Sequence, residues 1–204
     1  MRFDLQVIAS WIEPDSRVLD LGCGQGDLLW HLKNAKGVQG TGIELDEERA
    51  ARAIERGLTV LQGDINQEVC DYPDHSFDYV VLSQTLQQVH EPEKLLRQLL
   101  RIGGRVIVSF PNFSHWANRL QLLLQGRAPV SDQLPYAWYD TPNIRVITIR
   151  DFKRFVRHMG VRLAREVAIN THHHDQQGHV IRYWTNLRAT YGIMMLERLE
   201  QDHR

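Results

Sequence analysis

Three glycines stand at alternate positions, Gly22, Gly24 and Gly26, directly after the apolar run at residues 17–21. Glycine lacks a Cβ atom, so it suits places where a backbone bends tightly or where a ligand approaches the chain closely. A turn of this kind after the first strand of a parallel sheet opens a crevice for a nucleotide. The spacing therefore predicts a nucleotide-type ligand at this turn, and a tight turn without a ligand is the alternative.

Acidic residues around the turn indicate the charge of that ligand. A dinucleotide site follows the pattern G-x-G-x-x-G and holds a pyrophosphate at the start of a helix. Here the third glycine comes one place early, Asp20 precedes the turn and Asp27 follows it. Two carboxylates would repel a pyrophosphate and attract an ammonium or sulfonium group. The sequence therefore favours a ligand with a positive group over a dinucleotide.

Polar residues also follow the next three predicted strands. Glu44 ends the second strand, where a carboxylate can accept hydrogen bonds from both hydroxyls of a ribose, and a solvated carboxylate at a strand end is the alternative. Asp64 follows the third strand in a Gly-Asp turn, which is common elsewhere and so is weak evidence alone. Ser83 follows the fourth strand. Because the carboxyl ends of parallel strands share one edge of a sheet, we expect these residues to surround one crevice.

The elements that must position these residues alternate between strand and helix. Such alternation implies parallel strands joined by right-handed helical crossovers, and so an α/β fold of three layers. The predicted strands cover residues 17–21, 38–44, 58–62, 77–82, 105–110, 161–169 and 190–199, the last as an antiparallel partner. The predicted helices cover residues 1–13, 27–35, 46–56, 92–101 and 150–159.

The alternation stops after Pro111. Residues 112–147 are rich in aromatic side chains and contain three prolines, which exclude one continuous helix. Residues 116–125 have helical periodicity, and the remainder is irregular. This composition is typical of a lid over a substrate or of a surface for a partner, and the sequence does not choose between the two.

Composition limits the classes of protein and partner. A chain of 204 residues with 43% hydrophobic residues is most simply one domain over residues 1–204, with 112–147 as an insertion. Its 24 basic and 25 acidic residues give no basic excess of the kind that binds nucleic acid or an anionic membrane. Two cysteines and the absence of a signal pattern or a long apolar stretch predict a cytoplasmic protein that does not enter a membrane.

A run of histidines invites comparison with a metal site. His172, His173 and His174 are followed by Asp175 and His179. Consecutive side chains in an extended loop point in alternate directions and do not converge on one ion. We therefore expect a solvated loop and no metal.

The pattern Asp20-x-Gly22-x-Gly24-x-Gly26 resembles motif I of class I S-adenosylmethionine (SAM) methyltransferases. The resemblance implies a Rossmann-like fold with a mostly parallel seven-stranded sheet and an antiparallel C-terminal strand. It also implies SAM or S-adenosylhomocysteine as cofactor, with Asp20 facing the methionine end, Asp64 accepting from the adenine amino group and Ile65 packing on the ring. The expected cofactor-binding residues are Asp20, Gly22, Cys23, Gly24, Gly26, Glu44, Leu45, Asp64, Ile65 and Ser83.

Three further segments extend the resemblance over the whole chain to the MetW family of methionine-biosynthesis proteins. They are Ser109 to Trp116, Leu134 to Arg145, and Trp184 to Leu187, with Thr185 where the family pattern leads us to expect proline. The resemblance implies a methyltransferase-like companion of a homoserine O-acyltransferase. A domain that binds SAM, the downstream product of methionine, could report its level to that enzyme through an interface.

The alternative is a SAM-dependent methyltransferase of an unidentified small molecule. The chain lacks the Asn/Asp-Pro-Pro-Tyr/Phe motif often found after the fourth strand in methyltransferases of amino groups in DNA and of protein glutamine, which disfavours that substrate class. Transfer to oxygen or an acidic carbon needs a base, and His90 and His115 are candidates by location, although a lone histidine is more often structural. The catalytic residue is therefore left unassigned. A scaffold that has lost its ligand is a third reading, which the presence of Asp20, Glu44 and Asp64 disfavours, and a homo-oligomer is compatible with any of them.

Overall fold

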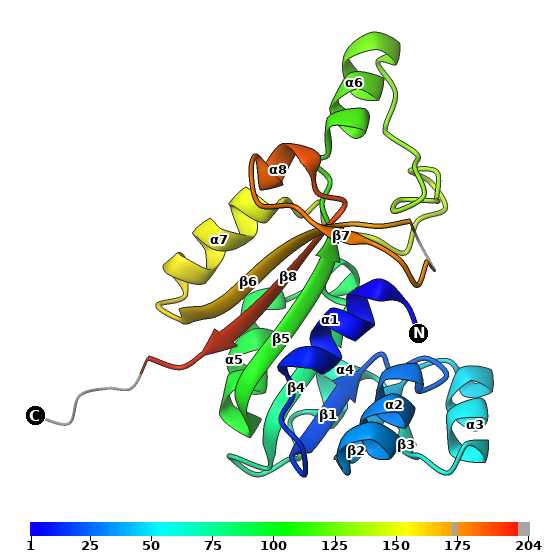
Figure 1. Ribbon diagram of the computed structural model, residues 1–204, viewed down its shortest axis with the longest axis vertical. Helices are drawn as coiled ribbons and strands as arrows, with labels where there is room; N and C mark the ends of the chain where they lie inside the picture. The colour runs from blue at the N-terminus through cyan, green and yellow to red at the C-terminus, as the bar shows by residue number, and fades with distance from the viewer. Residues whose placement is uncertain (173–174, 200–204) are drawn as a thin grey trace, which may run out of the picture.

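The computed structural model describes residues 1–172 and 175–199, and these form one twisted sheet flanked by helices (Figure 1). The eight strands described follow the order β3-β2-β1-β4-β5-β8-β6-β7. Their bounds are β1 Arg17–Leu21, β2 Gln39–Glu44, β3 Thr59–Gln62, β4 Phe77–Ser83, β5 Gly103–Pro111, β6 Arg162–Asn170, β7 His179–Val180 and β8 Tyr191–Glu197.

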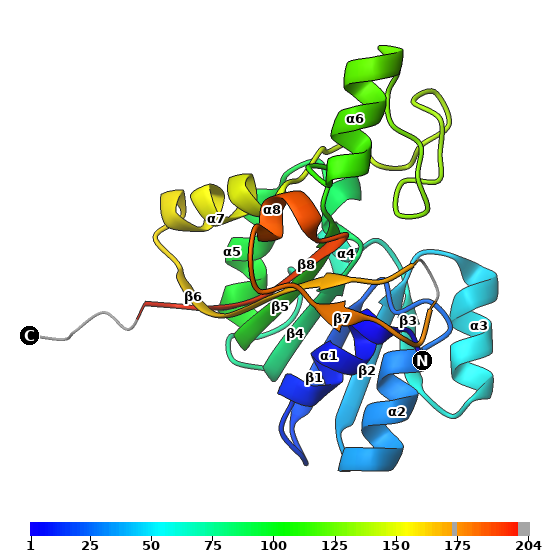
Figure 2. The same cartoon turned by 45° about the horizontal axis from the view of Figure 1, so that its top comes forward.

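Helices cover both faces of this sheet, which makes three layers (Figure 2). One apolar cluster joins the sheet to α1, α2 and α3, and a second joins it to α5 and α7. The helices described are α1 Phe3–Trp11, α2 Asp27–Lys36, α3 Glu47–Glu55, α4 Ile65–Glu68, the 3₁₀ turn η1 Leu86–Gln88, α5 Pro92–Ile102, α6 Trp116–Gln125, α7 Ile149–His158 and α8 Thr185–Arg188. None of these helices has the length and apolar composition needed to cross a membrane.

The pairing of strands confirms the predicted fold class. The first five strands pair in parallel, with Leu19 of β1 opposite Thr41 of β2 and Val80 of β4. Strand β8 is antiparallel to β5 and to β6, as predicted for the C-terminal strand. The prediction of seven strands missed β7, because a strand of two residues has no periodicity that a sequence could display.

Local sequence explains where the helices begin. Asp46 and Thr148 precede α3 and α7, and each side chain accepts a hydrogen bond from the backbone N–H three residues later. Such a cap satisfies a donor that the first turn of a helix leaves unpaired. Pro92 occupies the first turn of α5, where its missing N–H has no cost. All three starts agree with the predicted helices.

The segment at residues 112–147 departs from the sheet at the carboxyl end of β5 (Figures 1 and 2). Its first part is α6, with the bounds that the periodicity predicts, and Asn118 is the one buried residue within it. The part after α6 contains no helix or regular strand, apart from an isolated bridge between Ser131 and Leu134. The middle of the segment also contacts the domain, since Asp132 pairs with His172 and the side-chain amide of Gln133 donates to the carbonyl of Thr171.

Candidate functional site

The glycine turn connects β1 to α2 and is hydrogen-bonded to the carboxyl end of β2. Gly22, Gly24 and Gly26 have φ angles of 71°, 57° and 76°, a left-handed conformation that other residues adopt with strain. The N–H groups of Gly22 and Cys23 both donate to the carbonyl of Ile43, at 2.8 and 3.2 Å. The alternate spacing of glycines therefore reflects three left-handed residues in one turn.

The three glycines face different surroundings. A Cβ at Gly26 would overlap Leu58, and a Cβ at Gly22 would lie 2.7 Å from the hydroxyl oxygen of Thr85. A Cβ at Gly24 would have no neighbour within 4 Å. Gly22 and Gly26 are therefore required by packing, whereas Gly24 presents bare backbone to open space, as expected where a ligand approaches.

Asp20 is the acidic group beneath this turn. Its exposed fraction is 3%, and no described residue donates a hydrogen bond to its carboxylate. Burial raises the pKa of Asp20 to about 7; Arg2 opposes this change and Glu44 adds to it. A buried carboxylate without a donor is costly. An ammonium or another donor of a bound ligand would satisfy it, so this residue fits the predicted cofactor.

Glu44 connects the end of β2 to the glycine turn. One carboxylate oxygen accepts a hydrogen bond from the N–H of Gly24 at 2.7 Å, and the other accepts from the N–H of Asp46 at 3.0 Å. Each oxygen retains a lone pair for a further donor. Leu45, the next residue, is exposed beside it. Binding of ribose hydroxyls by Glu44 stays a prediction.

Cys23 has a packing role within the turn. Its side chain is buried, and a Cβ at Gly42 would lie 2.6 Å from its sulfur. Burial raises the pKa of the Cys23 thiol, and the negative charges of Asp20 and Glu44 raise it further. The thiol is therefore kept protonated and is unsuited to act as a nucleophile.

Asp64 and Ile65 lie at the carboxyl end of β3, next to the end of β2. The N–H of Gly63 donates to the carbonyl of Glu44 at 3.0 Å, which brings the two strand ends together. One oxygen of Asp64 caps α4 by accepting from the N–H of Asn66 at 2.9 Å. Ile65 is half-buried against the core. The roles predicted for both residues toward adenine remain predictions.

Ser83, the last residue of β4, was predicted as a site residue. In the structure it lies in a cluster of polar side chains whose other members the sequence did not indicate. Its hydroxyl lies 3.1 Å from that of Ser109 and 3.4 Å from a guanidinium nitrogen of Arg2. Gln84, the next residue, has a left-handed φ of 54°, and its side-chain amide donates to Asp4 at 2.8 Å. A strained residue of this kind often marks a functional site.

Asp27 differs from its predicted role toward a positive ligand group, because it pairs with a residue outside the turn. Its carboxylate pairs with Arg56 of the α3 end at 2.7 Å, and that guanidinium also donates to the carbonyl of Gln25. The charge of Asp27 is therefore balanced from outside the turn. Asp20 and Glu44 supply the negative charge that a positive ligand group would meet.

The candidate histidines occupy separate places. His90 is exposed. His115 directly precedes α6, and burial lowers the pKa of its imidazole. The Nε2 atom of His115 has no hydrogen-bond partner among the described residues. His172 pairs with Asp132 at 2.8 Å, and this carboxylate raises the pKa of the imidazole. His173 and His174 lie outside the described residues, and within the described ranges no group of three His, Cys, Asp or Glu side chains is arranged to hold a metal.

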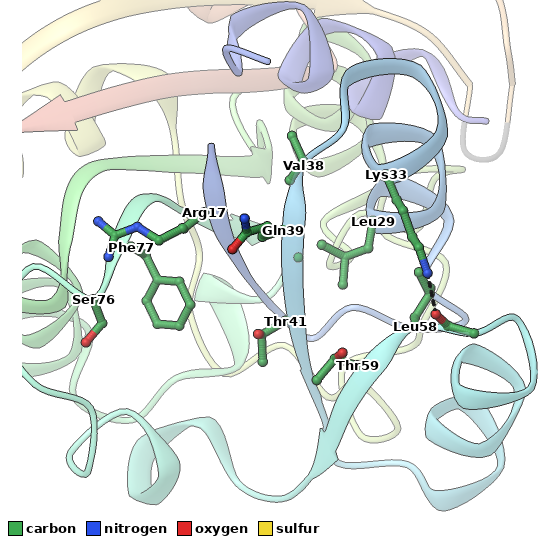
Figure 3. Close-up of a pocket in the computed structure, with 12 residues that line it drawn as sticks. Arg17, Leu29, Lys33, Val38, Gln39, Thr41, Leu58, Thr59, Ser76 and Phe77 are labelled. Carbon is green, nitrogen blue, oxygen red and sulfur yellow. Dashed lines mark hydrogen bonds between the residues drawn. The ribbon is translucent and has the colours of Figure 1, made fainter. Parts of the chain in front are cut away.

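A cavity of about 470 Å³ lies elsewhere, at the amino ends of the strands (Figure 3). It is lined by Arg17, Gln39 and Phe77, which begin β1, β2 and β4. Lys33 also lines it, and its ammonium donates to the carbonyl of Gly57 at 2.7 Å. Ligands of open α/β sheets bind at the carboxyl ends of the strands. This cavity is therefore distinct from the predicted cofactor site.

Comparisons with known proteins identify the family. Residues 2–196 match the family model described as methionine biosynthesis protein MetW. The chain is 34% identical over 176 residues to the bifunctional methionine biosynthesis protein MetXA/MetW of Rhodopirellula baltica. This match covers 82% of the chain and 28% of the relative, so the chain corresponds to a little over a quarter of that fused protein.

Solved structures agree on the fold. A SAM-dependent methyltransferase of Thermotoga maritima, described as a possible histamine N-methyltransferase, has a TM-score of 0.70 at 21% identity, covering 97% of this chain and 88% of its own. The [4+2]-cyclase SpnF has a TM-score of 0.66 at 18% identity, covering 95% and 80%. One fold thus carries different activities. The extended match to the family model is more specific, and by it the chain belongs to the MetW family of methionine biosynthesis proteins.

Proposed function

We propose that this protein binds SAM or S-adenosylhomocysteine and acts in the cytoplasm as a regulatory or activating companion of a homoserine O-acyltransferase. The observation that carries the ligand half of the proposal is the buried carboxylate of Asp20, which lacks a donor beneath a turn of left-handed glycines. When bound, SAM would supply a sulfonium-linked methyl group and an ammonium group. Asp20 would hold the positive end of the ligand, and Gly24 would admit the ligand to the backbone.

The fused relative supports the choice of partner. In the bifunctional protein of R. baltica, a MetW part and a MetXA part belong to one chain. Two functions joined in one polypeptide in one organism are often carried by two associating chains in another. The chain described here would then need a surface for a separate acyltransferase.

Helix α6 offers such a surface. Trp116, Leu120, Leu123 and Leu124 follow the spacing of one helix face, and all four are exposed, Leu123 and Leu124 at 80% and 72%. A helix of ten residues is marginal in water unless a packed face stabilises it. Contiguous exposed apolar side chains are typical of interaction sites. We therefore assign α6 to the partner interface, in preference to a lid over a substrate.

Contacts connect this segment to the loop after β4. The side-chain amide of Gln87 donates to the carbonyl of Gln84 at 2.6 Å, and the carbonyl of Gln87 accepts from the N–H groups of Ile144 and Arg145, both at 3.0 Å. Gln84 in turn lies beside Ser83 at the predicted cofactor site. A ligand that shifts the Gln84 loop would therefore move the end of the 112–147 segment. This connection supplies a physical route for regulation.

Calorimetric titration tests the proposal. The purified protein is titrated with SAM and with S-adenosylhomocysteine, alone and with the homoserine acyltransferase of the same organism. We expect binding that tightens in the presence of the partner, and by linkage an acyltransferase activity that changes with the ligand. Binding that ignores the acyltransferase would favour a methyltransferase of an unidentified small molecule. Absence of binding would contradict the ligand half of the proposal.

A matched pair of variants tests the surface. Leu123→Ser combined with Leu124→Ser removes the most exposed part of the α6 face, and Ile54→Ser changes an exposed apolar residue on α3. We expect the α6 variant to weaken acyltransferase binding at least tenfold and the α3 variant to leave it unchanged. Equal binding by both variants would exclude α6 from the interface. Sedimentation of the protein alone would reveal whether a second copy covers this face.

A further inference from the structure

Helix α7 carries three arginines on its outward face. Arg150, Arg154 and Arg157 are spaced four and three residues apart, so their side chains leave the helix on the same side. Phe152 and Val156 are buried from the other side. All three arginines are exposed, and no hydrogen bond or ion pair joins their guanidinium groups to a described residue. These three residues, called the arginine stripe below, present unpaired positive charge to the surroundings.

The stability of α7 does not explain the arginine stripe. Like charges three or four residues apart on a helix repel one another. Arg150 lies in the first turn, where the helix dipole disfavours a cation, and Arg157 alone lies in the last turn, where a cation is favoured. Asp151, the one acidic residue of α7, accepts instead from the hydroxyl that caps the helix. On α5, by contrast, the exposed Arg97 pairs with Glu93 one turn earlier, at 2.8 Å.

The arginine stripe adjoins the α6 surface. The side-chain oxygen of Asn186 accepts from the N–H of Arg150 at 3.0 Å, and its amide nitrogen donates to the hydroxyl of Ser114 at 3.1 Å. Asn186 thus joins the start of α7 to the residues that lead into α6. Helix α8 lies between α6 and α7 in both views, and Trp184 directly before it is 76% exposed (Figures 1 and 2). The surface therefore passes from the exposed apolar side chains of α6 to the positive charges of α7.

An acidic protein surface fits this combination better than a nucleic acid or an anionic membrane does. Those polyanions select a large basic excess, whereas the chain has 24 basic and 25 acidic residues. Interfaces between proteins combine an apolar centre with a polar rim, and charges on the rim chiefly accelerate association.

We propose that the arginine stripe receives an acidic surface of the protein that binds α6, and that its charges steer this partner into place. The inference rests on the proposed function and specifies both a second part of the interface and the chemistry of the partner surface. The apolar α6 side chains would hold the complex together, and the arginine stripe would set how fast it forms.

A matched pair of charge reversals tests the proposal. Arg154→Glu reverses the middle charge of the stripe and places a carboxylate within one turn of both Arg150 and Arg157, so it should not lower the temperature of thermal unfolding. Arg165→Glu makes the same change at an exposed arginine of β6 that has no partner among the described residues. Arg165 lies opposite Met195, which packs in the apolar cluster on the face of the sheet away from α7.

Stopped-flow mixing with the homoserine acyltransferase of the same organism measures the association and dissociation rates at low and high salt. We expect Arg154→Glu to slow association about fivefold or more at low salt, with a smaller effect at high salt and little change in dissociation. Arg165→Glu should associate like the unaltered protein.

Equal association rates of the two variants would overturn the role of the arginine stripe and leave the proposed function intact. Binding of double-stranded DNA or of phosphatidylserine vesicles by the unaltered protein, lost in Arg154→Glu, would also overturn it and assign the stripe to a polyanion. Failure of the unaltered protein to bind the acyltransferase would overturn this inference together with the proposed partnership.

Discussion

Glu44 and Gly24 are joined by a hydrogen bond of 2.7 Å between a carboxylate oxygen and a backbone N–H, so the end of the second strand sets the position of the middle glycine of the turn. The same carboxylate accepts from the N–H of Asp46 with its other oxygen. One side chain thus holds the glycine turn and the start of α3. Both carboxylate oxygens of Glu44 therefore already make structural hydrogen bonds in the absence of a ligand.

Replacing Glu44 should therefore reduce stability as well as ligand binding. Glu44→Ala leaves two backbone N–H groups without their acceptor, and we expect a loss of about 2–4 kcal/mol in the free energy of unfolding. Urea unfolding measures it. Glu48→Ala, at an exposed position on α3, is the control and should change stability by less than about 0.5 kcal/mol. Equal unfolding of the two variants would show that the Glu44 contacts contribute nothing.

Gly24 and Gly26 should respond differently to the same substitution. Gly26→Ala adds a left-handed alanine whose Cβ overlaps Leu58, and we expect a destabilisation of roughly 2–4 kcal/mol. Gly24→Ala carries the backbone strain alone, roughly 1–2 kcal/mol, because its Cβ meets open space. Calorimetry should show that the folded Gly24→Ala protein binds SAM more weakly than the unaltered protein. Normal SAM binding by Gly24→Ala would contradict the close approach of a ligand there.

Asp20 should make the stability of the protein depend on pH. Burial raises its pKa to about 7 in the folded protein, whereas an unfolded chain has the ordinary value near 4. The folded state therefore holds the proton more tightly, so the stabilisation from this group is complete below about pH 4 and is lost as the pH rises to about 7.

Asp20→Asn keeps the shape of the side chain and removes this titration. We expect the variant to be more stable than the unaltered protein by roughly 2–4 kcal/mol at pH 8, with a smaller difference at pH 5. Urea unfolding at the two pH values measures both quantities. The same variant should bind SAM more weakly, because it lacks the charge for a positive group. A pH-independent difference between the two proteins would refute the assigned titration.

Sequence and structure agree where a local pattern fixes a local conformation. The alternate glycines correspond to three left-handed residues, and two of the predicted helices begin at the side-chain caps of Asp46 and Thr148. The strand ends that carry Asp20, Glu44 and Ser83 meet at one edge because parallel pairing brings them there. These features depend on spacing within a few residues and on general rules of topology.

The features that the sequence could not supply depend on contacts between distant segments. Arg2 approaches Ser83 across 81 positions, and Arg56 balances Asp27 across 29 positions. No local pattern of residue types predicts such pairs. The left-handed backbone of Gln84 was equally hidden, because glutamine gives no signal for that conformation. The polar cluster beside the predicted site was therefore found only in three dimensions.

Asn112 shows how two segments that carry the family resemblance are held together. Its amide nitrogen donates to the carbonyls of Asn186 and Ala189, at 3.2 and 2.8 Å, and its oxygen accepts from the N–H groups of Ser114 and Ile149, both at 3.3 Å. These four contacts join the end of β5 to α8 and to the starts of α6 and α7. The side chain is 2% exposed.

Asn112→Ala should therefore release the base of α6. The loss of four buried contacts should cost roughly 2–4 kcal/mol, measured by urea unfolding. Asn112→Asp retains an acceptor for Ser114 and Ile149 but turns a buried carboxylate oxygen toward the carbonyls of Asn186 and Ala189, so we expect a cost at least as large as that of Asn112→Ala. At a temperature where both variants are folded, acyltransferase binding should fall in the same order, since α6 would no longer be held at a fixed angle. If a destabilised variant binds the acyltransferase normally, the Asn112 contacts stabilise the fold but are not needed for α6 to bind the partner.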